Sequence, residues 1–396
     1  MLDLGLRVGY VSTYPPRACG IASYTRDLAR AMFMRGKVYQ TLIVAINEPR
    51  GNRYSDHNVR CTIDPHERES YISAANFLNG ADVDVVNLQH EYGIFGGEWG
   101  EYVLDLCKNL KKPLVSTFHT VLRSPPKKAR EVTLELAEMS SAVIVTIESA
   151  ARLLEKRLRV NPDKIKVVRH GTALPDRMRN EYAKRQLGLG KRTVLATFGL
   201  ISSGKGIEYA IEALSHLVRE RPDLLYLVIG ETHPEVRRHE GEAYREKLVS
   251  LTGRLRLERH VRFIDCYVRD EELSLYLQAV DIYLAPYLGK DQVSSGTLTL
   301  ALGHGKAVIS TPTTFAKEVL SGNRGLFCKF GNARSLAECV ERILGDSRLR
   351  RELEANAFKY GQEVGWTRVA DQYGDILRSA IGTRRTVAEA TEISET

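Results

Sequence analysis

The chain has 396 residues, enough for two or three domains that each bury a core of their own. Apolar residues make up 43% and charged residues 27%, which excludes a mainly disordered or collagen-like chain. The 57 lysines and arginines exceed the 49 acidic residues by eight. An excess of this size favours anionic partners, among them nucleotides, phosphorylated substrates and an acidic membrane surface.

Several protein classes are disfavoured by what the sequence lacks. It has no window of 18 apolar residues that would span a membrane, and its start, with Asp3 and Arg7, does not resemble a signal peptide. The six cysteines form no C-x-x-C pair, which is typical of a reducing cytosol and argues against a zinc site or a disulfide framework. An RNA-binding aromatic signature is missing too, so we expect a cytoplasmic protein that binds no nucleic acid.

Short, β-branched apolar runs alternate with helical periodicity along most of the chain. This alternation predicts parallel sheets covered by helices on both faces, which is an α/β architecture. In such sheets ligands bind beyond the carboxyl ends of the strands, so the turns that follow strands should carry the chemistry. The predicted strands are 7–11, 42–46, 83–88, 114–118 and 143–146 in a first group, and 194–198, 225–229, 261–264, 282–285 and 307–310 in a second.

A polar stretch, Thr172–Lys191, separates the two groups of strands. It is rich in arginine and lysine and has no predicted strand, so we place the domain boundary there. The sequence thus predicts one doubly wound domain over 1–172 and a second over 190–365, with a cleft between them. A last helix is predicted over 366–382, and the polar tail 383–396 is predicted to be disordered because it lacks core residues.

The clearest local signal is the turn Gly199–Gly206, which follows a predicted strand and precedes a predicted helix. Glycines let the backbone approach a phosphate, while the helix N-terminus and Lys205 supply donors and positive charge. Gly206 stands where a P-loop has the hydroxyl that holds Mg²⁺, which disfavours a P-loop ATPase. We therefore favour a phosphate site, with Gly199, Ser203 and Lys205, over a plain strand–helix turn.

The first predicted strand–helix turn, Ser12–Gly20, contains two prolines and ends at a glycine before the helix. Gly20 would admit a ligand to the helix N-terminus, and Arg17 would meet an anion there. The alternative, which the sequence supports equally, is a rigid surface loop in which Gly20 serves only the turn.

Two histidines follow neighbouring predicted strands: His90, next to Glu91, and His119. Because the carboxyl ends of parallel strands meet at one edge of a sheet, we expect both side chains to point into one crevice. The alternative is that one of the two is structural. Metal binding is a second interpretation, but no trio of ligands with suitable spacing accompanies them, so we expect no metal.

A further polar turn, 291–297, follows the predicted strand 282–285. Its small hydroxyl residues, with Gly296 at a helix start, would bind an anion or sugar hydroxyls through Ser295 and Thr297. An ordinary helix capped by Ser294 or Ser295 is the alternative.

From about Val8 to about Ile381 the sequence resembles a retaining glycosyltransferase of family 4, also called group 1. The resemblance implies the GT-B fold, in which two Rossmann-like doubly wound domains face a central cleft and a helix starting here at Trp366 crosses back to the N-terminal domain. It rests on the order and spacing of its motifs: the Gly20 turn, His90-Glu91, Phe118-His119-Thr120, Asp163–Gly171, Gly199…Lys205-Gly206, Val228–Gly230, Val261–Phe263, Ala279–Asp281, and Ala301 followed by Gly305–Ile309.

The resemblance implies roles for individual residues. His119, at the donor sugar, and Lys205, at the diphosphate, are the implied catalytic residues. Arg17, His90 and Glu91 would lie on the acceptor side. The donor is a nucleotide-diphosphate sugar, and no metal or cofactor is implied because lysine and helix N-termini replace the metal. The implied donor-binding residues are Gly20, Gly199, Ser203, Lys205, Phe263 at the base, Gln292, Ser295, Gly296 and Thr297.

Two glutamates that the family usually carries eight positions apart are replaced here by Gln292 and Leu300. The Gln292 amide can still hydrogen-bond sugar hydroxyls, whereas Leu300 cannot bind a ribose. Leu200 also replaces an arginine that is common after the glycine of the phosphate turn. Donor binding is therefore expected to differ in detail from that of the family.

The activity implied by the resemblance is transfer of a hexose, with retention, to a hydroxyl of a glycan, a glycoside or a lipid-linked sugar. The alternatives are a non-catalytic nucleotide-sugar binding protein and a GT-B sugar phosphorylase. The basic stretch Arg123–Arg130 would suit a peripheral contact with the inner membrane surface, although a solvated loop before a helix is the favoured interpretation.

Overall fold

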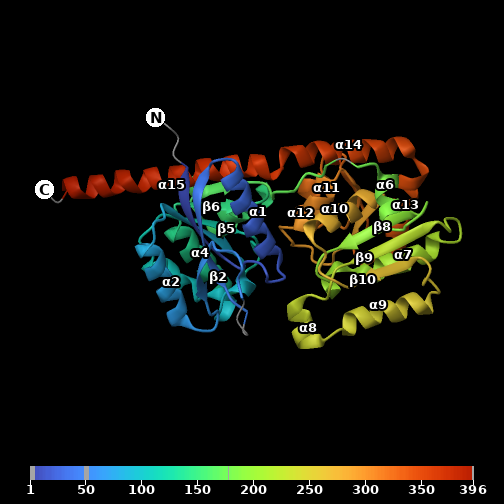
Figure 1. Ribbon diagram of the computed structural model, residues 1–396, viewed down its shortest axis with the longest axis horizontal. Helices are drawn as coiled ribbons and strands as arrows, with labels where there is room; N and C mark the ends of the chain where they lie inside the picture. Colours follow the sequence, from blue (N-terminus) through green and yellow to red (C-terminus); the bar gives the residue numbers. More distant parts are fainter. Residues whose placement is uncertain (1–4, 49–52, 177, 395–396) are drawn as a thin grey trace. The chain divides into compact units, whose positions relative to one another are not determined.

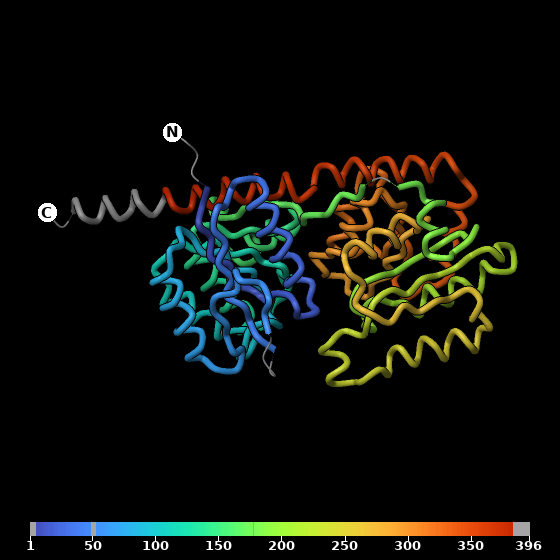
Figure 2. Tube along the Cα trace, viewed as in Figure 1, coloured from blue at the N-terminus to red at the C-terminus, as the bar shows by residue number. Residues whose placement is uncertain are grey.

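The computed structural model describes the backbone of residues 5–48, 53–176 and 178–394, with side chains as far as residue 382. The chain divides into two compact units: unit 1 is Met1–Gly171 with Trp366–Thr396, and unit 2 is Thr172–Gly365. Figure 2 shows that unit 1 is built from both ends of the sequence, the blue-to-green first part and the red C-terminal helix. Within the described residues, no helix combines the length and the apolar character that crossing a bilayer requires.

In the described part of unit 1, seven parallel strands form one sheet in the order β3-β2-β1-β4-β5-β6-β7. Figure 1 labels β2, β5 and β6 of this sheet. The chain starts in the middle of the sheet, winds to one edge and then returns to build the other half, which is the doubly wound arrangement. The strands are β1 Leu6–Ser12, β2 Val38–Ile46, β3 Val59–Ile63, β4 Val85–His90, β5 Leu114–Phe118, β6 Ala142–Val145 and β7 Ile165–Val167.

The C-terminal helix completes the core of unit 1. Helix α15 buries Val369, Tyr373 and Leu377, which recur every four residues and so lie on one face. This face packs against α1 and shares one apolar cluster with it. The helices of the unit are α1 Gly20–Met34, α2 Arg68–Gly80, α3 Val103–Asn109, α4 Lys127–Met139, α5 Glu148–Arg152 and α15 Trp366–Ser394, with single turns η1 Tyr92–Ile94, η2 Glu98–Gly100, η3 Leu153–Leu158 and η4 Pro162–Lys164.

Unit 2 repeats the same winding. Its described residues form a six-stranded parallel sheet in the order β10-β9-β8-β11-β12-β13. The strands are β8 Thr193–Phe198, β9 Leu224–Ile229, β10 Val261–Ile264, β11 Ile282–Ala285, β12 Ala307–Ser310 and β13 Gly325–Phe327. The helices are α6 Asn180–Gln186, α7 Ile207–Leu217, α8 Pro234–Glu240, α9 Ala243–Arg254, α10 Asp270–Ala279, α11 Gly296–Gly303, α12 Thr314–Val319, α13 Ala333–Gly345 and α14 Ser347–Glu363, with the turn η5 Ser203–Lys205.

The α/β architecture expected from the sequence is confirmed, and each of the ten predicted strands overlaps an observed one. The apolar pattern missed β3, β7 and β13, which are all edge strands, although the Asp163–Gly171 motif of the resemblance covers β7. They are only partly buried, so they lack the continuous apolar run that marks a central parallel strand.

Two segments differ from their predictions. The stretch predicted as a linker, 172–191, contains α6 and belongs to unit 2. Helix α15 continues to Ser394, past the predicted end at 382 and into the tail predicted to be disordered. That segment has alanines and glutamates and no glycine or proline after Gly382, a composition that sustains a helix. Residues 395 and 396 of the predicted tail lie outside the described residues.

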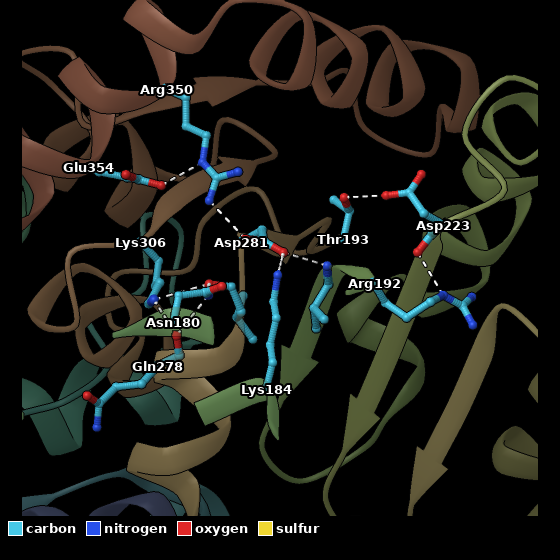
Figure 3. Close-up of polar contacts among 12 residues, drawn as sticks. Asn180, Lys184, Arg192, Thr193, Asp223, Gln278, Asp281, Lys306, Arg350 and Glu354 are labelled. Carbon is cyan, nitrogen blue, oxygen red and sulfur yellow. Dashed lines mark hydrogen bonds and ion pairs between the residues drawn. The ribbon is translucent and has the colours of Figure 1, made fainter. Parts of the chain in front are cut away.

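The amino end of the unit 2 sheet is held by a buried carboxylate, Asp281 (Figure 3). Its Oδ2 accepts hydrogen bonds from Lys184 Nζ at 2.6 Å and from the Val194 backbone N–H at 2.7 Å. Its Oδ1 accepts from Arg350 Nη2 at 2.9 Å, and Arg350 in turn donates to Glu354. The Asp281 side chain thus ties α6 and α14 to the start of β8, and both of its carboxylate oxygens accept hydrogen bonds.

Replacing Asp281 with alanine should destabilise the protein by about 3–5 kcal/mol, because the buried Lys184 ammonium would lose its counter-charge. Denaturant unfolding followed by circular dichroism measures this. Asp223→Ala is the matched control. Asp223 is exposed and accepts a hydrogen bond from Thr193 of β8, so its replacement should lower the free energy of unfolding by under about 1 kcal/mol. Equal effects of the two substitutions would contradict the assignment.

Candidate functional site

The strand pairing of unit 1 brings the two predicted histidines to the same edge of the sheet. His90 ends β4, His119 follows β5, and the His119 backbone N–H donates to the His90 carbonyl at 3.0 Å. Their side chains separate, however, because side chains alternate between the faces of a sheet. The His119 ring lies against Tyr24 of α1, whereas the His90 ring lies against Phe118 and Phe95. The expectation of one shared crevice is therefore corrected.

A chain of buried amides defines the chemical state of His119. Asn87 Nδ2 donates to the Val115 carbonyl at 3.0 Å, which leaves Asn87 Oδ1 as an acceptor. Gln89 Nε2 donates to that oxygen at 2.5 Å, so Gln89 Oε1 is the atom that faces His119 Nε2 at 2.8 Å. An amide oxygen only accepts, so His119 Nε2 must carry the proton.

His119 is consequently a neutral imidazole with its lone pair on Nδ1. Burial, with smaller contributions from His170 and His90, lowers the pKa of His119 to about 3. Among the hydrogen bonds of the described residues, none involves Nδ1, and this atom is not one of the fully buried unpartnered atoms. The site therefore offers a ligand a hydrogen-bond acceptor at this position, such as a sugar hydroxyl would use.

The same hydrogen-bond network reaches helices α1 and α15. Thr117 Oγ1 and the hydroxyls of Tyr373 and Tyr24 are linked in a row at 3.0 Å each. Sequence reasoning gave no role to Gln89, Tyr24 or Tyr373, although Gln89 directly precedes His90 and Thr117 lies two positions before His119. The signal available was the two-residue period, which places Asn87, Gln89, Thr117 and His119 on one face.

His90 and Glu91 have different surroundings from His119. Both ring nitrogens of His90 are buried without a hydrogen-bond partner, and burial lowers its pKa to about 3. Glu91 accepts from the Tyr92 backbone N–H and from Thr120 Oγ1 at 2.5 Å, while burial raises its pKa. The carboxylate therefore fixes the loop that leaves β4, and the imidazole packs as a neutral aromatic ring.

Gly20 is the first residue of α1, and a Cβ placed there would meet no atom within 4 Å. The protein's own packing does not require a glycine at this position, so the bare first turn leaves room for a ligand. Arg17 is partly buried, with its guanidinium 3.9 Å from the Glu48 carboxylate and 3.5 Å from the Asn47 carbonyl. Its charge is thus shared with an acidic neighbour.

In unit 2 the turn Gly199–Gly206, which the sequence predicts to bind phosphate, is shaped by close backbone approaches. Gly206 has φ +63° and a Cβ there would lie 2.2 Å from the Pro286 carbonyl oxygen, so no hydroxyl residue fits. A Cβ on Gly230 would lie 2.2 Å from the Gly199 carbonyl oxygen. These contacts press the turn, the end of β9 and the segment after β11 together, and they explain why the P-loop hydroxyl is absent.

Lys205 lies where these segments converge. A Cβ on Gly199 would be 3.3 Å from Lys205 Nζ and 2.8 Å from the Thr297 methyl group, so the three residues form one cradle. Lys205 Nζ also stands 5.4 Å from the centre of the Tyr287 ring, and the Tyr287 hydroxyl bonds Thr297 Oγ1 at 2.6 Å. Sequence reasoning did not single out Tyr287, because its contact with Lys205 joins two segments that are far apart in the chain.

Of the other predicted donor residues in unit 2, Ser295 is linked to this cradle through the hydroxyls of Tyr287 and Thr297. Ser295 is the N-cap of α11 and accepts from the Leu298 N–H, as the structural alternative predicts, while Gly296 begins that helix. Gln292 donates to the Ser294 carbonyl at 2.9 Å. Phe263 is partly buried against the unit 2 core and is not part of the Lys205 cradle, and Ser203 is exposed in the turn η5.

Two family models match the chain over most of its length. "Glycosyltransferase Family 4" matches residues 18–174, and "Glycosyl transferases group 1" matches residues 179–360. Each match lies mainly in one of the two Rossmann-like units just described. The chain belongs to the group 1 glycosyltransferases of family 4, which have the GT-B fold.

Curated relatives include D-inositol 3-phosphate glycosyltransferases. The protein of Jonesia denitrificans is 26% identical over 65% of this chain and 64% of its own length, and that of a Nocardioides strain is 23% identical over 68% and 62%. The chain thus spans slightly under two thirds of the length of these relatives.

Solved structures of similar fold cover almost the whole chain. HepE of Anabaena, solved in complex with UDP, has a TM-score of 0.73 at 15% identity over 94% of this chain and 100% of its own. A sucrose-phosphate synthase of Thermosynechococcus elongatus has a TM-score of 0.77 at 18% identity over 95% and 100%. At these identities the likeness shows the fold.

His119 should stay neutral, with its proton on Nε2, from pH 5 to pH 8. Long-range ¹H–¹⁵N spectra of the imidazole report both the tautomer and the charge, and titration of His119 within this range would contradict the derivation. Gln89→Leu removes the accepting oxygen, so in that variant the fixed tautomer should be lost while the ring remains buried.

The same burial makes stability depend on pH. The folded-state pKa values of His90, His119 and His170 lie at about 3, 3 and 4, below the ordinary histidine value. The unfolded chain therefore binds protons first as the pH falls below about 6.5, and the free energy of unfolding should decrease from pH 6.5 to pH 4. Urea unfolding at several pH values tests this sign.

Proposed function

We propose that the protein is a retaining glycosyltransferase that moves a sugar from a nucleotide-diphosphate sugar to a hydroxyl acceptor. The observation that carries the proposal is the cradle of Gly199, Lys205 and Thr297 at the carboxyl end of β8. Its ammonium and its hydroxyl suit a diphosphate, and the start of α7 adds backbone dipole. The UDP complex of HepE, which shares the fold, supports a nucleoside diphosphate as the ligand.

The proposed reaction breaks the bond between the anomeric carbon and the diphosphate oxygen. The acceptor oxygen forms its bond to the same carbon from the same face, so the configuration is retained, and the departing phosphate oxygen takes the acceptor's proton. Charge develops on the diphosphate, and Lys205 with neighbouring N–H groups stabilises it as it forms. This donor set matches an anion directly, so we propose that the reaction needs no resident metal.

His119 would bind the donor sugar rather than the base. Its Nδ1 lone pair accepts a hydrogen bond from a hydroxyl near the anomeric carbon, and its neutral state keeps a positive charge away from the developing oxocarbenium ion. His119 and Lys205 are therefore the proposed catalytic residues. The network from Gln89 holds the imidazole in the orientation that this contact requires.

The acceptor proposed is a sugar hydroxyl in a glycan, a glycoside or a lipid-linked sugar. The D-inositol 3-phosphate glycosyltransferases among the relatives support a polyhydroxylated acceptor in general. Assays of nucleotide diphosphate release with a panel of nucleotide sugars and simple glycosides test transfer itself.

A non-catalytic nucleotide-sugar binding protein is the second candidate, favoured by Gln292 and Leu300 at positions where the family has carboxylates. Binding of nucleotide sugar without release of nucleotide diphosphate, with any acceptor, would support it. Sugar phosphate formed only with inorganic phosphate would instead indicate a phosphorylase.

Lys205→Ala should weaken binding of the tightest among UDP, GDP and ADP by about 10- to 100-fold, because a charge-assisted contact worth about 1.5–3 kcal/mol is lost. Isothermal titration calorimetry measures the affinity. Lys359→Ala, which removes an exposed ammonium on α14, is the control and should leave it unchanged. An unaltered affinity in Lys205→Ala would refute the phosphate cradle.

Ribose recognition should be loose because Leu300, partly exposed on α11, offers the ribose no polar atom. We expect the nucleoside diphosphate and its 2′-deoxy form to compete within about tenfold of each other, whereas a site built to bind the hydroxyl discriminates by roughly 10⁴. Competition binding measures the ratio. Leu300→Glu should increase the preference for the ribo form, and a strong preference already in the wild type would mean that another polar group binds the ribose.

A further inference from the structure

The loop that leaves β4 holds an exposed tryptophan in a disfavoured backbone conformation. Trp99 has φ +56° and ψ +30°, which is the left-handed region that residues with a Cβ rarely adopt, and the residue is 37% exposed. A strained, exposed aromatic residue gains little from core packing. Strain of this kind is kept where the surrounding structure enforces it, and it concentrates at ligand-binding sites.

The surrounding loop is built to hold this conformation. A Cβ on Gly96 would lie 1.5 Å from the Pro65 carbonyl oxygen, and one on Gly97 would lie 2.7 Å from the Tyr102 ring. Gly100 has φ +75°, and a Cβ there would lie 2.8 Å from the Tyr92 carbonyl oxygen. The loop is therefore packed tightly on both sides of Trp99, so its indole is presented by a rigid support.

The indole is fixed from one side by aromatic contact. The Tyr92 ring meets it edge to face, with centroids 5.5 Å apart and planes at 89°. Tyr92 is itself buried and its hydroxyl bonds Thr133 Oγ1 of α4 at 2.6 Å, while the next turn is tied to α4 by the Lys128–Glu101 ion pair. The orientation of the indole is thus determined before any ligand arrives.

The exposed loop residues that precede Trp99 in the chain are small or polar. Among the described residues between Phe77 and Leu174, which are all in unit 1 or at its boundary, Trp99 is the one large hydrophobic side chain that is exposed. Its exposed neighbours in the loop are Gly97 and the carboxylate of Glu98. A protein partner would need a wider apolar patch than one ring. A pyranose needs one aromatic face for its C–H groups and polar atoms at the rim for its hydroxyls.

We propose that Trp99 is a stacking platform for a pyranose ring of the acceptor saccharide. The platform lies on the α4 side of the edge that carries His90, whereas the His119 ring lies on the α1 side, so donor and acceptor sugars would have separate supports. That the bound saccharide is the acceptor rests on the proposed function. The platform narrows the proposed acceptors to those that carry a pyranose.

Saturation-transfer NMR with methyl α-D-glucopyranoside, methyl α-D-mannopyranoside and methyl β-D-galactopyranoside tests the platform on the full chain. At least one glycoside should receive saturation on the C–H groups of one ring face in the wild type. Trp99→Gly should weaken its binding by about tenfold or more, while Trp99→Phe should stay within about threefold of the wild type. Absence of transfer to all three glycosides, or equal binding by Trp99→Gly, would overturn the proposal.

The glycine substitution separates binding from folding. Glycine adopts the left-handed region freely, so Trp99→Gly relieves the backbone and should retain the wild-type melting temperature within a few degrees. Tyr39→Ala is the matched control, since Tyr39 is an exposed aromatic residue at the start of β2 and should not affect glycoside binding.

Two further outcomes are informative. With Trp366→Phe, Trp99 is the sole tryptophan, and its emission should respond to the glycoside that binds. A response to UDP alone, with none to any glycoside, would mean that the indole senses the nucleotide and not a saccharide, and would overturn the platform. The protein could bind a glycoside through Trp99 and yet show no transferase activity. That result would refute the proposed function and support the saccharide site at Trp99.

Discussion

The hydrogen bond from Asn87 to the Val115 carbonyl fixes the direction of the whole buried polar chain in unit 1. Because a carbonyl only accepts, the Asn87 amide must present its nitrogen there, and each following group has one orientation left. The chain ends at His119, whose free lone pair is the result. A functional property of one side chain is thus decided by a backbone atom on the neighbouring strand.

The same network makes the C-terminal helix part of the site. The Tyr373 hydroxyl of α15 bonds Thr117 of β5, a residue 256 positions earlier in the chain. Tyr373 also bonds Tyr24 of α1, whose ring packs against His119. Helix α15 therefore does more than cover apolar surface: it completes the polar contacts behind His119, and in a dry environment each such contact is costly to leave unmade.

In unit 2 the carboxyl end of the sheet is shaped by close backbone packing and not by a polar network. There the limiting factor is space: backbone carbonyls approach Gly206 and Gly230 so closely that a side chain is excluded at both positions. The opposite end of the sheet is anchored by the buried Asp281 carboxylate and its three donors. The buried ion pair thus lies at the amino ends of the strands, whereas the crowded glycine turn and the Lys205 ammonium lie at the carboxyl ends.

The sequence by itself determined the α/β class, the central strands and the family, because buried parallel strands read as continuous apolar runs and the glycine turns are local in sequence. It also placed Lys205 and His119 at strand ends. The apolar pattern missed the edge strands β3, β7 and β13, because partial burial removes the continuous apolar run.

Only the tertiary structure decided which side chains meet. It separated His90 from His119, because the side chains of neighbouring strand positions alternate between faces, and it brought Tyr287 to Lys205 and Tyr373 to the His119 network. It also showed that Ser295 caps a helix and that Trp99 is held with a positive φ. Contacts between distant segments and backbone angles set by packing leave no local pattern, so they follow from the folded chain alone.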